Sequence, residues 1–403
     1  ISTKVIRKVY IFDMKKIGLS VVIYKDNFGS ALQTFATQYV VSKLGFDAEC
    51  IDTTDIQATI DAKKKKYYLR RVFNKEELKY LFSFISSMFR KKMQSAAYAN
   101  NMIIRHEQYT KFNDNFLKLS RRVNSFEDLT ELSKSYDALI VGSDQLWRPS
   151  NIAGCYFTLE FAAPGVKKIA YSTSFGVAKL HKSIRKHAKS FLCGFDWISV
   201  RENSGKTIVK EMIDRDVPVV CDPTMLLTIE EWCQNVSPEP IVNGDYILCY
   251  IMGESKEQRG FVKQLSKGTG CKVVGLLHGS TYVAGDDGWV DEAPYNIGPF
   301  EFINLIKHAK YVCTDSFHCC VFSILNNTSF FVFRRDADNE ETSANDRIYT
   351  LLSWSGIYDR LIYGTESIDE QLTKSINFED VNKKVEQRRA DSMEYLTNAL
   401  KTV

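Results

Sequence analysis

The segment 309-AKYVCTDSFHCCVFSIL-325 joins two apolar runs through a short polar turn. Residues 309–313 predict a buried strand and residues 317–325 a helix, so the polar turn and His318 lie at a strand-to-helix junction. In parallel α/β sheets, ligands bind beyond the carboxyl ends of the strands, where helix N-termini present free N–H groups. We therefore favour a functional role for His318 over the commoner role of a structural histidine.

The same alternation of short β-branched runs and longer amphipathic stretches extends over most of the chain. It is typical of parallel sheets joined by crossover helices. The expected strands form two series, separated by a Pro- and Gly-containing linker at 237–244: 18–24, 48–52, 138–141, 168–172, 197–200 and 218–221, then 246–251, 272–277, 311–314 and 330–333. The pattern predicts two Rossmann-like α/β domains that face each other across a cleft.

The boundaries follow from this division. We expect an N-terminal domain at 14–240, with a basic helical insertion at about 60–125, and a C-terminal domain at 245–378. Residues 379–403 predict a helix that crosses back to the first domain. Residues 1–13 precede Met14, whose context resembles a natural start, and are interpreted as an N-terminal extension.

Composition narrows the class of protein. The chain has 403 residues, of which 44% are hydrophobic, and this suits a globular protein of two domains. Its ten cysteines form no CxxC pair or zinc-finger spacing, so we interpret them as reduced core residues. No stretch offers the roughly 18 apolar residues of a spanning helix, and the N-terminus lacks a signal-peptide pattern. We expect a cytoplasmic protein.

The charge is unevenly distributed. The net charge of +4 argues against a nucleic-acid-binding protein, but residues 63–92 carry eleven Lys or Arg against two Glu. An aromatic, apolar run at 80–89 lies inside this basic segment. The combination suits a helix at an anionic membrane surface, at the inner face of the plasma membrane. A solvated helical insertion explains the same pattern equally well.

Other strand-to-helix junctions carry polar residues. Asn27 and Gln33 flank a glycine after the first strand, and Asp144, Gln145 and Trp147 follow the strand at 138–141. Proteins commonly bind sugars with polar side chains that hydrogen-bond the hydroxyls and an aromatic ring that packs on the apolar face of the sugar. This pattern favours a binding site for an acceptor sugar. An Asp N-cap beside a packed Trp is the structural alternative.

Two further junctions suit an anionic ligand. Ser172 and Thr173 follow the strand at 168–172, and Arg201 follows the strand at 197–200. A guanidinium offers a planar fork that matches a carboxylate or a phosphate. A salt bridge from Arg201 to Glu202 or Asp222 is the alternative.

Together, the segments NFGSALQ, VGSDQLW, IAYSTSFG, SVREN, CDPTMLL and TDSFHCCVFSIL, in this order from about Asn27 to Leu325, resemble the polysaccharide pyruvyl transferase family. The resemblance implies a fold similar to GT-B glycosyltransferases, phosphoenolpyruvate as donor and a pyruvate ketal on a hexose. It also implies a bacterial capsule or exopolysaccharide pathway, with galactose or an N-acetylhexosamine on a polyprenyl-diphosphate carrier as a plausible acceptor.

The resemblance assigns roles to the junction residues, with one departure. Many members carry an arginine two residues before the histidine, where this chain has Ser316. We expect Arg347 to supply the missing positive charge, with Arg334 or Arg335 as weaker candidates. Arg201, Ser316 and His318 would then complete the donor site with Ser172 and Thr173.

The expected mechanism uses His318 for proton transfer, Arg201 for the donor's charge and Asp315 to orient His318. It needs no metal, since no ligand cluster is visible in the sequence, and no cofactor beyond the co-substrate phosphoenolpyruvate. Two alternatives remain: a nucleotide-sugar glycosyltransferase of the same architecture, and a non-catalytic glycan-binding or scaffold protein of capsule assembly.

Overall fold

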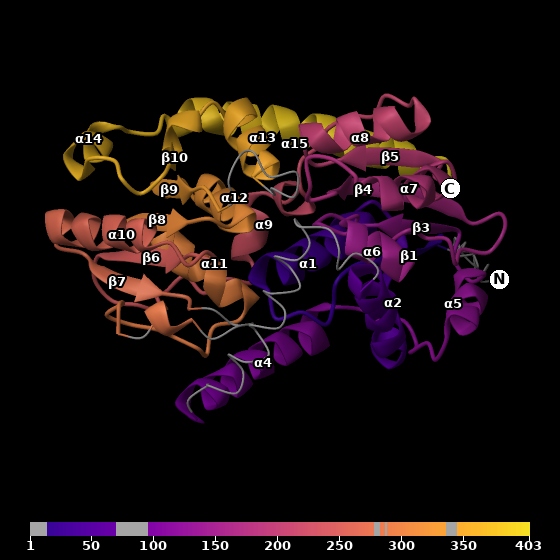
Figure 1. Ribbon diagram of the computed structural model, residues 1–403, viewed down its shortest axis with the longest axis horizontal. Coiled ribbons are helices and arrows are strands. Elements are labelled where there is room, and N and C mark those ends of the chain that lie inside the picture. The colour runs from indigo at the N-terminus through magenta and orange to yellow at the C-terminus, as the bar shows by residue number, and fades with distance from the viewer. Residues whose placement is uncertain (1–13, 70–95, 278–282, 287, 336–344) are drawn as a thin grey trace, which may run out of the picture.

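The computed structural model describes residues 14–69, 96–277, 283–286, 288–335 and 345–403. The chain forms two five-stranded parallel sheets, in the orders β2-β1-β3-β4-β5 and β10-β9-β8-β6-β7. Figure 1 shows the two sheets side by side, with helix α1 between them. In both sheets the carboxyl ends of the strands lead into the loops that carry the polar junction residues.

The first sheet holds the N-terminal half of the chain. Its strands are buried and apolar; β3, for example, has the sequence ALIV and is completely buried, as expected for a central parallel strand. The strands are β1 (Lys16–Ser20), β2 (Asp47–Cys50), β3 (Ala138–Val141), β4 (Lys167–Thr173) and β5 (Trp197–Val200). The helices of this half are α1 (Phe28–Lys43), α2 (Gln57–Leu69), α4 (Ala96–Phe116), α5 (Phe126–Ser133), α6 (Pro149–Gly154), α7 (Lys182–Leu192), α8 (Asn203–Ile213) and α9 (Ile229–Cys233).

The second sheet follows the linker. Its strands are β6 (Tyr246–Tyr250), β7 (Lys272–Gly275), β8 (Tyr311–Thr314), β9 (Phe330–Phe333) and β10 (Leu361–Ile362). The helices are α10 (Lys256–Thr269), α11 (Pro299–His308), α12 (Phe317–Leu325), α13 (Asp346–Ser355), α14 (Ile368–Thr373) and α15 (Phe378–Leu400). Every residue of α12 is buried, which explains why its sequence is apolar on all sides.

Two features of the sheets differ from the sequence-based expectations. Residues 218–221 are not a strand of the first sheet; only an isolated bridge joins Val219 to Val200. The proline at 218 cannot donate a ladder hydrogen bond, which weakens this pairing. The second sheet gains β10, a two-residue strand at its edge that is too short to leave a sequence signal.

The two sheets share a continuous apolar core. Phe28, at the start of α1, stacks on Phe302 of α11 with ring centroids 4.8 Å apart and an interplanar angle of 2°. Trp232 of the first half meets Phe322 of α12 edge-on, at 5.2 Å between centroids. Aromatic pairs of this kind stabilise an interface beyond their buried area. The two halves are therefore held together by packing as well as by the connecting chain.

Helix α15 runs back across both halves, along the top of Figure 1. Arg388 donates a hydrogen bond to the carbonyl of Val219, at 2.9 Å, and Arg389 donates to the carbonyl of Met225, at 2.7 Å. The hydroxyl of Ser392 accepts a hydrogen bond from the backbone N–H of Cys221. The C-terminal helix thus ends on the first half of the molecule.

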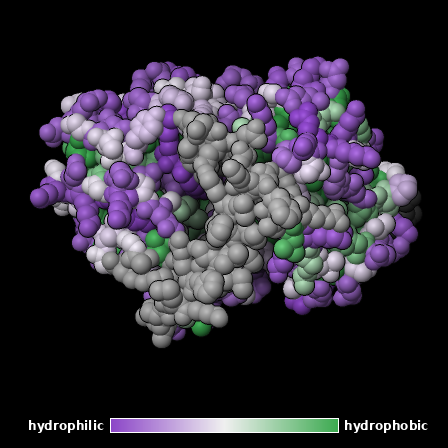
Figure 2. Space-filling model, in the orientation of Figure 1, coloured by the Kyte–Doolittle hydropathy of each residue, from purple (hydrophilic) through white to green (hydrophobic). Residues whose placement is uncertain are grey.

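The basic insertion is only partly described. Helix α2 carries Lys63–Lys66 and packs against α6, and α4 reaches the second half, where Arg105 donates to the carbonyl of Leu277 at 2.7 Å. Residues 70–92 of the basic segment and the extension at 1–13 lie outside the described residues. No helix in the described ranges is long and apolar enough to span a membrane. Figure 2 shows apolar residues in small separate patches on the visible face.

Candidate active site

A buried ion pair stands at the carboxyl ends of the first sheet. Arg201, directly after β5, donates from Nη1 to Oδ2 of Asp222, at 2.8 Å. The hydroxyl of Ser143, after β3, donates to the same oxygen at 2.7 Å, and Thr224 satisfies the other carboxylate oxygen. The side chains of Arg201 and Asp222 are 1% and 0% exposed. Such a pair is tolerated inside a protein only because hydrogen bonds satisfy the carboxylate.

The second sheet contributes His318 to this pair. Its ring reaches over from the first turn of α12, and Nε2 lies 3.4 Å from Oδ2 of Asp222. The ring of Phe317, one residue earlier, covers the guanidinium of Arg201 at 4.3 Å. The arginine and the histidine, from opposite halves of the molecule, therefore share one carboxylate.

The position of His318 depends on a glycine. The imidazole packs on Gly29 in the first turn of α1, and a Cβ atom at that position would lie 2.1 Å from Nδ1 of His318. Gly29 has an ordinary helical conformation, so the requirement for glycine is the close approach and not the backbone angle. This contact gives a physical reason for the glycine in the NFGS segment.

Asp144 joins the same group from the end of β3. It adopts a left-handed conformation, with φ of 79°, and Oδ2 accepts a hydrogen bond from the hydroxyl of Ser30 at 2.7 Å. Its other oxygen, Oδ1, accepts from the backbone N–H of Gln145 at 2.8 Å and lies 3.8 Å from Nη2 of Arg201. A non-glycine residue in this conformation is a strained feature that functional sites often contain.

The charges of the cluster reinforce one another. Burial alone would raise the pKa of Asp222, but His318, Arg201 and the hydrogen bond from Ser143 outweigh it and hold the pKa well below its usual range. Burial would likewise raise the pKa of Asp144, and Arg201, His318 and Lys25 hold it low. Both carboxylates are therefore ionised at neutral pH.

Arg347 adds a further cation. Burial is the main cause that lowers its pKa to about 9; the neighbouring charges of Arg201 and Arg335 contribute to this shift, while Asp144 and Glu202 oppose it. Crowded, desolvated cations repel one another, and a bound anion relieves this repulsion. Arg347 also lines a cavity of about 10 Å³, with Arg201, Asp222 and Phe317 among its other walls.

Several buried donors of the cluster lack hydrogen-bond partners among the described residues. They are Nε and Nη2 of Arg201 and Nε2 of His318, which faces Asp222 at an ion-pair distance only. Buried polar groups are nearly always satisfied, so each such donor requires an explanation. The first turn of α12, which carries Phe317 and His318, lies beside these donors, and the positive end of a helix dipole favours an anion. Together these groups can bind an anion.

Asp315 does not orient His318. Its carboxylate accepts hydrogen bonds from the backbone N–H groups of Met252 and Gly253, both at 2.8 Å, and pairs with Arg335 at 3.0 Å. The loop after β6 and Arg335 together occupy both of its oxygens. The carboxylate that faces His318 is Asp222, so the expected role of Asp315 is corrected.

Four other predicted residues are buried in the protein interior. Trp147 is completely buried, and its indole N–H donates to the carbonyl of Phe157, so neither face is open to a sugar. Gln33 bonds to Thr34 inside α1, and the hydroxyl of Thr173 bonds to the carbonyl of Gly142. Ser172 is also completely buried. In this structure, these side chains pack beneath the site and are not accessible to a ligand.

The remaining predicted residues lie at the site or beside it. Asn27 caps α1 by accepting a hydrogen bond from the N–H of Ser30, next to Asp144. Ser316 is the N-cap residue of α12, and its N–H is bound by the hydroxyl of Thr314. Gln145 accepts a hydrogen bond from Arg148 at 3.2 Å and borders a larger cavity.

The larger cavity has a volume of about 530 Å³ and lies in the first half of the molecule. It touches the charged cluster at Asp144 and does not reach Arg201 or His318. Its polar walls come from the loops after β1, β2 and β3, from α2 and from the start of α6: Tyr24, Lys25, Thr53, Gln57, Asp61, Lys64, Tyr68, Asp144, Gln145, Arg148, Ser150 and Asn151. The site thus has a crowded charged part and a roomier polar part, which meet at Asp144.

Sequence reasoning placed Asp222 and Glu202 only as alternative salt-bridge partners of Arg201 and assigned no specific role to Ser143 or Ser30. Glu202 is buried, and burial raises the pKa of its carboxyl, while Arg201 opposes the change. The signal for Asp222 was present, since it follows an apolar run in the CDPTMLL segment. That pattern does not reveal which side chain from the other half it faces.

Two solved structures share the overall arrangement. UDP-GlcNAc 2-epimerase from Neisseria meningitidis, bound to UDP-GlcNAc, matches with a TM-score of 0.52 and 10% identity, over 97% of this chain and 100% of that chain. A putative UDP-N-acetylglucosamine 2-epimerase from Listeria monocytogenes gives a TM-score of 0.51 and 9% identity, over 93% and 90%. At such low identity the likeness concerns the fold alone, and the GT-B-like pair of Rossmann-like domains is confirmed. No curated protein matches this chain significantly.

The family comparison is more specific. The model of the family described as polysaccharide pyruvyl transferase matches residues 27–337, which is most of the chain. The matched region contains Gly29, Asp144, Arg201, Asp222 and His318, and Arg347 lies just beyond it. The chain therefore belongs to the polysaccharide pyruvyl transferase family.

Proposed function

We propose that the protein transfers the pyruvyl group of phosphoenolpyruvate onto two hydroxyls of a hexose in a lipid-linked capsular polysaccharide precursor, forming a pyruvate ketal. The observation that carries this proposal is the convergence of Arg201, Arg347 and His318 at one place, between the two sheets. Phosphoenolpyruvate carries a carboxylate and a phosphate, and arginine forks suit both groups.

In this proposal the charged part of the site binds the donor. The unsatisfied Nε and Nη2 of Arg201 would donate to one anionic group, and Arg347 would neutralise the other. Ser316 and the N-terminus of α12 would supply the hydrogen bonds that a second arginine gives in other members. A bound dianion or trianion would also relieve the repulsion between the two buried arginines.

The charged part has to open before the donor enters. Its cavity of about 10 Å³ holds no more than a water molecule. Phe317 lies on the guanidinium of Arg201 and belongs to the opposite half of the molecule. A small separation of the two halves, which moves Phe317 and His318 together, would create the donor space and close again over the bound anion.

The larger cavity would take the acceptor sugar. Its polar walls suit hydroxyl groups, and its volume of about 530 Å³ falls in the range of small-molecule pockets. Asp144 stands where this cavity meets the cluster, 3.8 Å from Arg201. Its carboxylate would hold an acceptor hydroxyl toward the donor, with Asn27 and Gln145 nearby.

The first chemical step would protonate the methylene carbon C3 of the donor. The imidazole of His318, whose Nε2 lies 3.4 Å from the carboxylate of Asp222, would supply this proton. Protonation leaves cationic character at C2, where the first sugar hydroxyl forms a C–O bond and loses its proton to the imidazole. General acid–base catalysis of this kind contributes about 100 to 10,000-fold.

In the second step, the neighbouring hydroxyl attacks the same carbon and the C2–O bond to phosphate breaks. The released phosphate carries away the electron pair of that bond, and the proton of the second hydroxyl leaves with it. The products are the cyclic ketal and inorganic phosphate. Arg201 and Arg347 would stabilise the negative charge that develops on the leaving group.

The basic segment 63–92 would bring the enzyme to its lipid-linked acceptor. Its eleven cations suit an anionic membrane surface, where each contributes on the order of 1 kcal/mol. Lys64 lies on the wall of the larger cavity, so the described start of this segment adjoins the proposed acceptor site.

The proposal is tested by incubating the purified protein with phosphoenolpyruvate and a panel of lipid-linked or aryl galactosides and hexosamines. We expect phosphate release together with a product heavier by one pyruvate ketal in mass spectrometry. Hydrolysis of a UDP- or GDP-sugar without any ketal would support a glycosyltransferase instead. An absence of product together with no binding of phosphoenolpyruvate would contradict the proposal and favour a scaffold.

A further inference from the structure

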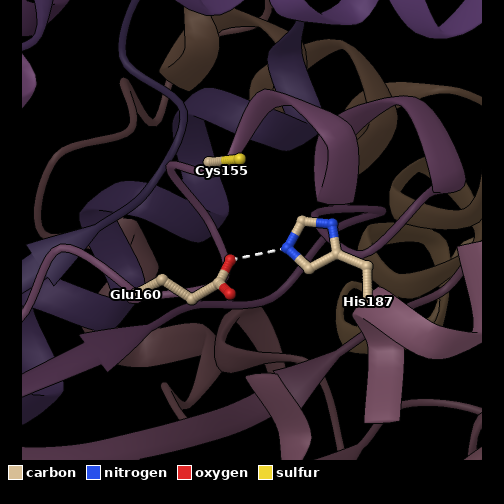
Figure 3. Close-up of side chains that lie close together, drawn as sticks. All are labelled: Cys155, Glu160 and His187. Atoms are coloured by element: carbon tan, nitrogen blue, oxygen red, sulfur yellow. Dashed lines mark hydrogen bonds and ion pairs between the residues drawn. The ribbon is translucent and has the colours of Figure 1, made fainter. Parts of the chain in front are cut away.

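A second cluster of reactive side chains lies in the first half of the molecule, away from Arg201 and His318. Cys155 follows α6, Glu160 follows five residues later, and His187 projects from α7. One donor atom from each lies within 4.8 Å of the other two. Figure 3 shows the three side chains around a common space. Nε2 of His187 lies 2.7 Å from Oε2 of Glu160.

The loop between Cys155 and Glu160 folds back to bring these residues together. Cys155 and Leu159 both have left-handed backbone conformations, with φ of 64° and 51°, and the side chain of Leu159 is completely buried. The hydroxyl of Thr158 donates to Oε2 of Glu160 at 2.8 Å. The carboxylate is therefore oriented by a neighbour, as ligands of metal sites commonly are.

We propose that Cys155, Glu160 and His187 bind a divalent zinc ion. Thiolate, imidazole and carboxylate are the three side-chain ligands that zinc uses in proteins, at distances of roughly 2.0–2.3 Å. Three protein ligands leave one tetrahedral position for water, and all three side chains are partly exposed, so the ion has an entry path. A sulfur ligand disfavours the hard cations magnesium and calcium.

Binding requires small movements and the release of protons. Zinc would take the place of the proton shared by His187 and Glu160, so these two side chains would separate slightly. Cysteine ligates zinc as a thiolate, so the ion displaces the thiol proton of Cys155. Zinc binding should therefore strengthen as pH rises.

The ion would fix one wall of the larger cavity. Tyr156 and Phe157, which lie between the two loop ligands, line that cavity, and the carbonyl of Phe157 holds the indole N–H of Trp147. Zinc would tie this loop to α7 through His187. We therefore assign the ion a structural role, which does not depend on the reaction proposed for the enzyme.

The test uses the full-length protein, freed of metal with a chelator and dialysed against zinc. We expect one zinc per chain by elemental analysis, and an increase in melting temperature on zinc addition. Cobalt in place of zinc should give an absorption band from thiolate-to-cobalt charge transfer, because Cys155 is a ligand. Cys155→Ser and His187→Gln should each abolish stoichiometric binding.

Cys193→Ser is the matched control, since Cys193 is an exposed free cysteine at the end of the same helix α7. It should retain zinc and the cobalt band. The proposal is overturned if the wild-type protein binds no more zinc than Cys155→Ser, or if cobalt binds without the sulfur band. Circular dichroism of each variant shows whether a loss of zinc binding reflects unfolding. If Cys155→Ser is unfolded, zinc binding by the folded His187→Gln variant tests the proposal instead.

Discussion

Gly29 and His318 are in direct contact across the two halves of the molecule. The imidazole occupies the space of a side chain at position 29, where a Cβ atom would stand 2.1 Å from Nδ1. The proton carrier of the proposed reaction is therefore positioned by a residue that has no side chain, in the first turn of a helix that belongs to the other sheet.

Replacing Gly29 with Ala should displace His318 from Asp222. We expect kcat to fall about 100-fold, because a shift of about 1 Å in a catalytic group has this effect. Stability should fall by about 1–3 kcal/mol, the usual result of overpacking. Steady-state kinetics and urea unfolding measure the two effects. Gly260→Ala is the control: its Cβ would meet nothing within 4 Å, so activity should be unchanged.

Replacing His318 with Gln should remove proton transfer while preserving the fold. We expect kcat to fall about 100 to 10,000-fold, with donor binding altered only a few-fold. Calorimetric titration with phosphoenolpyruvate separates the two quantities. His308→Gln, at the end of α11, serves as the control and should remain fully active. Near-normal turnover of His318→Gln would show that another group transfers the proton.

Replacing Asp222 with Asn should change how stability depends on pH. The pKa of Asp222 is depressed in the folded protein, so its carboxylate contributes stability above its unfolded value of about 4, and this contribution is lost as pH falls through the folded pKa. Asn removes the counter-charge nearest to the buried Arg201 and leaves only the more distant carboxylates, such as Asp144 at 3.8 Å, so stability at neutral pH should fall by about 3 kcal/mol.

Urea unfolding of both proteins from about pH 7 down to about pH 2, through the unfolded pKa of about 4, measures this difference. The free energy of unfolding should decline less steeply with acidification in Asp222→Asn than in the wild type. Asp214→Asn is the control, since Asp214 is exposed and has a left-handed backbone conformation that Asn tolerates. Parallel curves for wild type and Asp222→Asn would argue against the depressed pKa.

Replacing Arg347 with Met should separate stability from donor binding. Removing a buried, crowded cation should leave the melting temperature unchanged or raise it. The KM for phosphoenolpyruvate should rise at least about 10-fold, because a hydrogen bond to a charged group contributes about 1.5–3 kcal/mol. Arg215→Met, which removes bonds to the carbonyls of Phe195 and Asp196, is the contrasting control. An unchanged KM would exclude Arg347 from the donor site.

Replacing the seven Lys and Arg residues between 70 and 92 with Gln should weaken binding to anionic vesicles. Each lost cation removes on the order of 1 kcal/mol, so sedimentation with phosphatidylserine vesicles should fall close to that with neutral vesicles. The control removes exposed lysines of α10, namely Lys256, Lys263 and Lys267, and should bind normally. Equal sedimentation of all proteins would contradict the membrane contact.

The strands and helices of the second half were largely predictable. The expected strands 311–314 and 330–333 and the expected helix 317–325 coincide with β8, β9 and α12. These segments are buried apolar runs with polar turns at their ends, so local composition alone determines their limits. Residues 218–221 are also an apolar run, but Pro218 has no N–H to donate, and only an isolated bridge to β5 forms in place of a strand.

Sequence analysis identified the cations of the site and the carboxylate of Asp144, but it did not identify the role of Asp222. Arg201 and His318 stand at strand ends, and that position is readable from the sequence. The partner of His318 is Asp222 and not the nearby Asp315. Asp222 lies in the other half of the molecule, far from His318 in the sequence, so no local pattern reveals this contact. Trp147 shows the complementary problem: an aromatic residue beside a polar loop has the same pattern whether it is open or buried.

The stacked pair Phe28 and Phe302 has a consequence for how the protein loses activity. Because this pair belongs to a core common to both sheets, heating should melt the two sheets in a single cooperative transition. His318 meets Asp222 only while that core is intact. Thermal inactivation and thermal unfolding should therefore have the same midpoint temperature. Neither half of the chain, expressed alone, should have any activity.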